Sequence, residues 1–119
     1  MYKIPDDFNL TSIKSQTISQ IAFGLNYITI FFNKGFIQFS GGFAFELDGH
    51  NFNYEEVYPV QNDYGLIKLL LEKQIIDIYT NIEKNNLYMK LDNGNLLLLF
   101  GSEQYESFIV NIDGKQIIV

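Results

Sequence analysis

Cysteine and arginine are both absent from this sequence of 119 residues, and each absence excludes a class of protein. Without cysteine there is no disulfide scaffold, no zinc–thiolate site and no cysteine nucleophile, which fits a reducing compartment, so we expect a cytoplasmic protein. The eight basic residues are scattered lysines and the net charge is −6. Nucleic acids and anionic membranes need clustered cations, so neither is an expected partner. A basic protein is the partner that this charge favours.

Targeting and membrane segments are also not expected. The first ten residues include Asp6 and Asp7 and lack the basic-then-apolar pattern of a signal peptide. The longest apolar runs are too short for a membrane-spanning helix. Hydrophobic residues make up 47% of the chain, which is enough for one folded domain with a core.

The clearest structural pattern lies between residues 87 and 100. Leu87, Met89 and Leu91 occupy alternate positions, which is the period of a strand with one buried face. A second apolar segment follows after Asn93 and Gly94, a pair that favours a two-residue type I′ turn. The pattern predicts a β-hairpin.

Residues 27–39 repeat this pattern 59 positions earlier, so that Gly35 aligns with Gly94. At this offset Ile37 aligns with Leu96, and weaker matches lie upstream and downstream at offsets of 57 and 65. The ordered series favours two related β units, although amphipathic strands also resemble one another by chance.

The sequence predicts a single domain of the α+β class that is mainly β. Two antiparallel meanders, at about residues 15–49 and 73–119, form a barrel or a sandwich, and a connection with one short helix occupies about residues 50–72. Residues 95–100 are nearly all apolar, so we expect a central strand covered on both faces, partly by the helix. The expected strands are 17–23, 27–32, 36–40, 43–47, 74–81, 87–91, 95–100, 105–112 and 116–119, and the expected helix is 63–71.

Catalytic and metal-binding patterns are weak. The only histidine, His50, follows Asp48 in a turn, where a solvated side chain is the ordinary outcome. Asp48, Glu55 and Glu56 lack the alternating oxygen ligands of a calcium loop. We therefore expect neither catalytic residues nor a bound metal or cofactor.

The acidic connection at residues 48–63 is the best candidate for a binding surface, because tyrosine and phenylalanine alternate there with acids. The alternative is a loop that those rings hold against its own core. A second acidic and aromatic stretch contains Glu103, Tyr105 and Glu106. The expected partner-binding residues are Asp48, Phe52, Tyr54, Glu55, Glu56, Tyr58 and Asp63.

Three short segments resemble a family of small uncharacterised bacterial proteins. They are Ile-Pro-Asp-Asp-Phe at residues 4–8, Tyr-Glu-Ser-Phe at 105–108 and Gly-Lys-Gln-Ile-Ile-Val at 114–119. Members of that family are similar to the immunity proteins of bacterial toxin systems. The resemblance implies a non-enzymatic protein that neutralises a cationic toxin, such as a nuclease, by binding it, and it assigns no functional residue.

Two other functions stay open at this point. One is a small-molecule-binding or enzymatic β-barrel with its cavity between the meanders. The other is a structural homodimer joined through an exposed sheet edge. The sequence alone leaves the oligomeric state undetermined.

Overall fold

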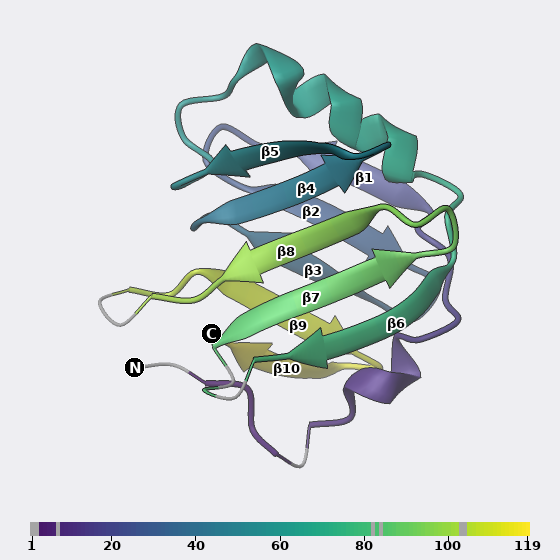
Figure 1. Ribbon diagram of the computed structural model, residues 1–119. Helices are drawn as coiled ribbons and strands as arrows, with labels where there is room; N and C mark the ends of the chain where they lie inside the picture. Colours follow the sequence, from purple (N-terminus) through teal and green to yellow (C-terminus); the bar gives the residue numbers. More distant parts are fainter. Residues whose placement is uncertain (1–2, 7, 82, 84, 103–104) are drawn as a thin grey trace.

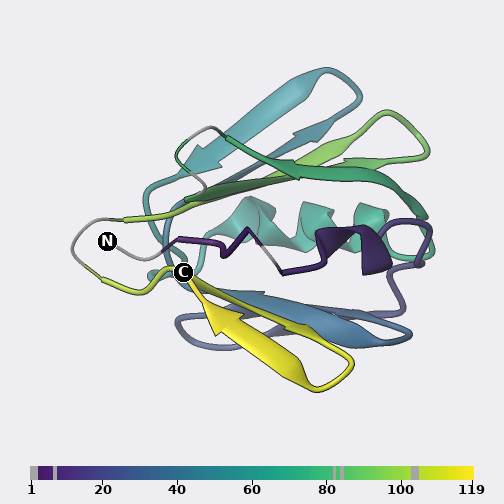
Figure 2. The same ribbon diagram turned by 90° about the horizontal axis from the view of Figure 1, so that it is seen from below.

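The computed structural model describes residues 3–6, 8–81, 83, 85–102 and 105–119, and it is a β-sandwich (Figure 1). The described residues form two separate five-stranded antiparallel sheets. Figure 2 shows the sheets packed face to face. Of the two expected architectures, the sandwich is therefore the one that forms, and no closed barrel is present among the described residues.

Each sheet combines strands from both halves of the chain. The first sheet has the order β1 (Gln20–Phe23), β2 (Ile28–Phe32), β3 (Gly35–Phe39), β9 (Phe108–Ile112), β10 (Lys115–Ile118). The second has the order β6 (Ile75–Thr80), β7 (Asn86–Leu91), β8 (Leu96–Phe100), β4 (Phe43–Leu47), β5 (His50–Tyr54). Each is a three-stranded meander completed by a hairpin from the other half.

This exchange of hairpins makes the chain cross between the sheets twice, at residues 40–42 and 101–107, on the left of Figure 1. We call this the crossing end; its connections are residues 24–27, 40–42, 55–61, 81–85 and 101–107. The opposite end, which we call the hairpin end, carries the turns at residues 33–34, 48–49, 92–95 and 113–114.

Alternate residues of the paired strands fill the space between the sheets. In the first sheet Ile37 pairs with Val110, and in the second Phe45 pairs with Leu97; all four are buried. Burying a side chain of this size contributes about 1.5–3 kcal/mol. The inner faces therefore hold the sandwich together.

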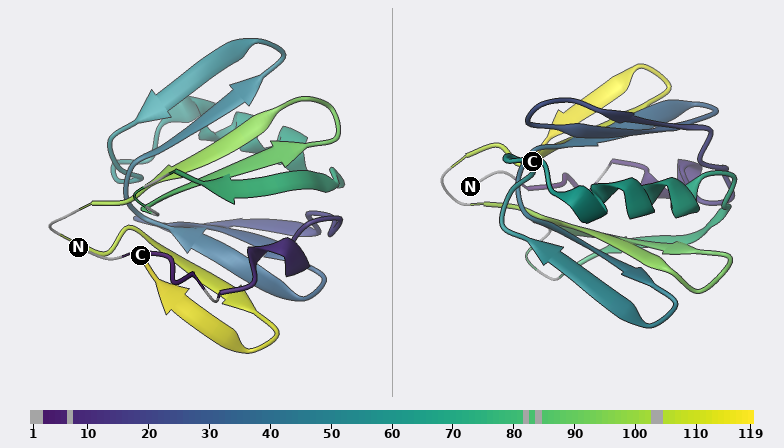
Figure 3. Two further views of the ribbon diagram at one scale, coloured as in Figure 1. Left: turned by 60° about the horizontal axis from the view of Figure 1, so that its bottom comes forward. Right: turned by 90° about the horizontal axis from the view of Figure 1, so that it is seen from above.

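The main helix, η2 (Asn62–Leu70), is a 3-10 helix that lies along the open edge beside β5 and β1 (Figure 3). With three residues per turn, Tyr64, Ile67 and Leu70 share one face, and all three are buried. The short helix η1 (Leu10–Ser12) lies near the opposite edge, beside β6 and β10 (Figure 2).

The expectation that the helix would cover β8 is wrong. Because η2 seals an edge, the outward side chains of β8, which are Leu96, Leu98 and Phe100, are only half-buried. The strand is central in its sheet, as predicted, between β4 and β7.

The region expected as an irregular connection contains a strand, β5, which pairs with β4. Asp48 and Gly49 before it have φ of +51° and +84°, which is the geometry of a type I′ turn. That turn directs β5 back along β4, and Phe52 pairs with Phe45 on the inner face. Asn51 and Asn53 face outward. Because asparagine is uncommon in strands, the sequence did not predict a strand here.

The turn at Asn93–Gly94 is not of type I′, which corrects a second expectation. Gly94 has φ +84°, whereas Asn93 is not among the described non-glycine residues with positive φ. The amide of Gly94 donates to the carbonyl of Leu91, and the amide of Leu91 donates to the carbonyl of Asn95. This is a three-residue loop with glycine in the left-handed position.

The longer turn changes the alignment between the two units. In β2–β3 Ile28 pairs with Phe39, and in β7–β8 Leu87 pairs with Leu99. The offset of 59 that relates Ile28 to Leu87 therefore becomes 60 in the next strand. Buried Ile37 corresponds to buried Leu97 rather than to half-buried Leu96.

Two glycines near these turns should respond differently to substitution. A Cβ on Gly35, where φ is +130°, would lie 2.1 Å from the carbonyl oxygen of Asn111 in β9. Gly94 has positive φ but open space around it. We expect Gly94→Val to lower the free energy of unfolding by about 1–2 kcal/mol. Gly35→Ala should cost more, because β3 and β9 must separate.

Urea denaturation of both variants measures this difference. Equal costs, or a larger cost at Gly94, would contradict the close approach of β3 and β9.

Candidate functional site at the crossing end

The crossing end holds three connections from different parts of the chain in one block. The amide of Val57 donates to the carbonyl of Ser40 at 3.1 Å. The amides of Ser40 and Gly41 both donate to the carbonyl of Ser107, at 2.9 and 3.1 Å. A Cβ on Gly41 would lie 2.8 Å from the Cβ of Ser107, so only glycine allows this approach. Hydrogen bonds therefore tie the three connections together at Ser40, Gly41, Val57 and Ser107.

Val57 and Tyr64 attach the acidic connection to the core of the protein. The Val57 side chain is fully buried. The Tyr64 hydroxyl, on η2, donates to the carbonyl of Val57 at 2.7 Å and lies 3.3 Å from the carbonyl of Glu56. Both of these residues were missed as site residues in the sequence. The side chains of Glu55, Glu56 and Tyr58 are exposed on this fixed segment.

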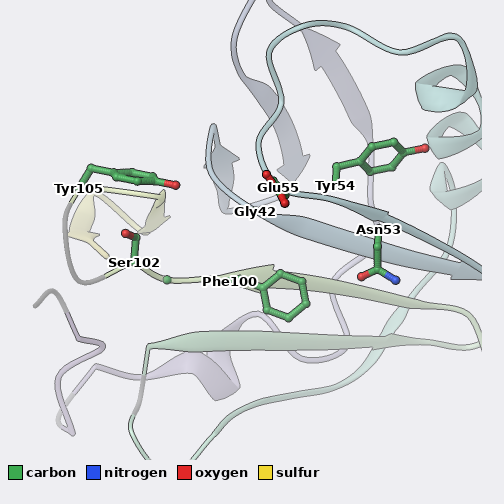
Figure 4. Close-up of a pocket in the computed structure, with 8 residues that line it drawn as sticks. Gly42, Asn53, Tyr54, Glu55, Phe100, Ser102 and Tyr105 are labelled. Atoms are coloured by element: carbon green, nitrogen blue, oxygen red, sulfur yellow. The ribbon is translucent and has the colours of Figure 1, made fainter.

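Two surface depressions flank the segment. The first, of about 600 Å³, is lined by Glu55 from one side and by Phe100 and Tyr105 from the other (Figure 4). The second, of about 470 Å³, is lined by Glu56, Tyr58 and again Tyr105. In an extended chain consecutive side chains point to opposite sides. Glu55 and Glu56 accordingly line different depressions, and each is the only charged residue in its described lining.

Exposed apolar side chains concentrate at this end. Of the eleven large hydrophobic residues that are exposed in the described part of the chain, six belong to or adjoin the crossing connections. Such a concentration on a small domain is typical of an interaction surface. The six residues are Phe23, Leu25, Tyr27, Tyr58, Val60 and Tyr105.

Charge is unevenly distributed between the two ends. The described residues of the crossing connections carry Glu55, Glu56, Glu83 and Glu106 and no lysine; Lys84 and Glu103 lie outside the described residues. Lysines accompany the acids at the hairpin end. The crossing end is therefore the more negative of the two. The lysines at or near the hairpin end are Lys14, Lys34, Lys68, Lys73, Lys90 and Lys115, and Lys3 belongs to the N-terminal segment.

The structure divides the expected binding residues into separate groups. Glu55, Glu56 and Tyr58 lie at the crossing end, where Tyr105 from the second predicted stretch joins them. Asp48 lies in a turn at the hairpin end, and exposed His50 follows it. The tertiary crossing, which no local pattern reveals, is what brings Tyr105 to Glu55.

Phe52 and Tyr54 belong to an aromatic cluster inside the molecule. The Phe52 ring stacks on Phe45 with centroids 4.8 Å apart. The Tyr54 ring lies 4.9 Å from Phe43 and 4.9 Å from Tyr64, perpendicular to the latter. Figure 4 shows Tyr54 directed away from the depression, toward η2. These two rings hold β5 against its own core.

The Tyr54 hydroxyl is buried and has no hydrogen-bond partner of ordinary geometry among the described residues. Its pKa is raised by burial first and then by its interaction with the Asp63 carboxylate. The pKa of Tyr64 is raised by burial and by the charges of Asp63 and Glu56. Asp63, an expected binding residue, thus lies at the start of η2 beside this cluster.

Other kinds of site find no support among the described residues. No group of three or more histidine, aspartate or glutamate side chains is placed to hold a metal ion there. Within the same residues, neither helix has the length and apolar character needed to span a bilayer. Comparison with protein-family models, with curated proteins and with solved structures gives no match.

Removing one hydroxyl from each of two neighbouring tyrosines should change stability differently. Tyr64→Phe leaves the Val57 carbonyl without its buried donor, so we expect the free energy of unfolding to fall by about 1–2 kcal/mol. Tyr54→Phe removes a buried hydroxyl whose interaction with Asp63 falls outside ordinary hydrogen-bond geometry, so we expect a smaller loss or none.

Urea denaturation at pH 7 measures both values, and each variant is the control for the other. A larger loss for Tyr54→Phe would mean that its hydroxyl, and not that of Tyr64, stabilises this end.

Proposed function

We propose that this protein is a non-enzymatic immunity protein, which neutralises a cognate cationic toxin by binding it through the crossing end. One observation carries the proposal: Glu55, Glu56, Tyr58 and Tyr105 line two depressions that share Tyr105, and neither described lining contains a lysine. A positively charged toxin domain, such as a nuclease, is the complementary partner.

The two kinds of side chain on this surface have different tasks in the proposed complex. The glutamates raise the rate of encounter with a cationic partner, an effect that salt screens. Tyr58 and Tyr105 supply large rings that lose little conformational entropy when they are buried in an interface. In many interfaces a few aromatic residues provide most of the binding energy, and the residues around them contribute little.

The fixed backbone beneath these side chains also supports the proposal. Val57 is buried, and the hydrogen bonds from Tyr64 and to Ser40 and Ser107 hold the connections before any partner arrives. A surface that is already ordered loses less entropy on binding than a flexible loop does.

The proposed contact residues therefore differ from those expected from sequence. Phe52 and Tyr54 pack within the molecule, and Asp48 lies at the far end. We assign the contact to Glu55, Glu56, Tyr58, Tyr105 and Glu106.

The alternative of a ligand-binding or enzymatic barrel required a cavity between the two meanders. The two sheets instead stay separate, and apolar side chains fill the space between their inner faces.

We further infer that the two β units are related by an internal repeat. The identical connectivity of the two sheets supports this, with β1–β5 corresponding to β6–β10.

The test is surface plasmon resonance against the toxin that co-purifies with the protein. The double variant Glu55→Gln, Glu56→Gln should associate more slowly, most clearly at low salt. Tyr105→Ala should instead dissociate faster, at a cost of roughly 2 kcal/mol if it is a hot spot. All these positions are exposed, so the fold should be retained.

A matched control is the double variant Asp92→Asn, Asp113→Asn, which replaces two acids at the hairpin end. It removes the same net charge and should bind almost as the parent does. If the control reduces association as much as the double glutamate variant does, only total charge matters and the crossing end is not the interface. Circular dichroism confirms that each variant is folded.

A further inference from the structure

We infer that the two depressions at the crossing end are a pair of cation sites, each accepting one basic side chain of the partner, with arginine preferred. This inference rests on the proposed function and names the chemical group that the surface recognises. It is carried by the linings of the two depressions.

The first depression has the groups that a guanidinium requires. Figure 4 shows the Tyr105 phenol directed from the β8–β9 connection toward Glu55, with the Phe100 ring below. A carboxylate accepts two parallel hydrogen bonds from arginine, and aromatic rings stack on its planar cation. Asn53 adds a side-chain amide to the lining. The volume of about 600 Å³ falls within the range of small-ligand sites.

The second depression repeats the same chemistry with different residues. Glu56 supplies the carboxylate, Tyr58 and Tyr105 supply rings, and Asn26 supplies an amide. Its volume of about 470 Å³ also suits one long side chain. Tyr105 is the wall that the two sites share.

Position along the chain explains why there are two sites rather than one. Glu55 and Glu56 are consecutive, and each lines a separate depression, with buried Val57 following them. Neither lining includes a lysine that would neutralise its glutamate. An arginine that enters either site would meet a glutamate and aromatic residues in the same described lining.

Arginine is favoured over lysine because these sites combine a carboxylate with aromatic faces. A guanidinium is planar, is more weakly hydrated than an ammonium and stacks on rings. Lysine offers only a compact, strongly hydrated charge, so it gains less from Phe100 and Tyr105.

The probe is N-acetyl-L-argininamide, titrated into isotopically labelled protein and followed by amide NMR shifts. Gly42 and Gly101 report on the first site, and Asn26 and Ser40 report on the second. N-acetyl-L-citrullinamide has nearly the same shape without the charge, and we expect it to bind at least about tenfold more weakly.

Three variants assign the sites. Glu55→Gln should abolish the shifts at Gly42 and Gly101 only, and Glu56→Gln should abolish those at Asn26 and Ser40 only. Tyr105→Ala should weaken both sets. A dispersed amide spectrum shows that each variant is folded.

The inference is overturned if citrullinamide binds as well as argininamide, or if shifts of equal size occur at the acidic turns containing Asp48, Asp92 and Asp113. Its failure can be distinguished from failure of the proposed function. If the probe does not bind but the glutamate variants still slow association with the toxin, the interface stands and only the arginine sites are wrong. If the probe binds and toxin binding is unaffected, the sites stand and the proposed interface is wrong.

Discussion

Each sheet of this protein is completed by a hairpin from the other half of the chain, and this exchange determines the rest of the structure. The β9–β10 hairpin pairs with β3, and the β4–β5 hairpin pairs with β8. Without the exchange each meander would have only three strands to cover the other. The chain must therefore cross between sheets twice, and both crossings lie at one end. As a result, Tyr105 and Glu55 line the same depression.

Rigidity and charge at this end come from the same packing. The aromatic cluster around Phe43 lies between β4, β5 and η2, and Tyr64 links it to the backbone of Val57. The acidic segment at residues 55–58 is consequently attached to the core through Val57. The described linings of the two depressions contain no lysine, so no basic residue there offsets Glu55 or Glu56. Both features favour fast and specific association with a cationic surface.

Part of the sheet structure could be predicted from alternation alone, because strands such as β7 and β9 bury every second residue. The strand β5 was missed because asparagines occupy its outward positions, although the Asp48–Gly49 turn before it was a usable signal. A helix was predicted at residues 63–71, but the three-residue spacing of Tyr64, Ile67 and Leu70, which indicates a 3-10 helix, was not used. Composition alone proposed Glu55, Glu56 and Tyr58 as contact residues. Their proximity to Tyr105 depends on a contact between distant segments, which local patterns do not encode.

The central claim is that the crossing end is the surface that the partner covers. Hydrogen exchange measured by mass spectrometry, on the protein alone and in complex with a protein that co-purifies with it, tests this most directly. We predict slower exchange on binding in peptides that cover residues 24–27 and 55–58, with no change in peptides that cover residues 92–95 and 113–115. Slower exchange at the hairpin turns, with none at residues 55–58, would contradict the account.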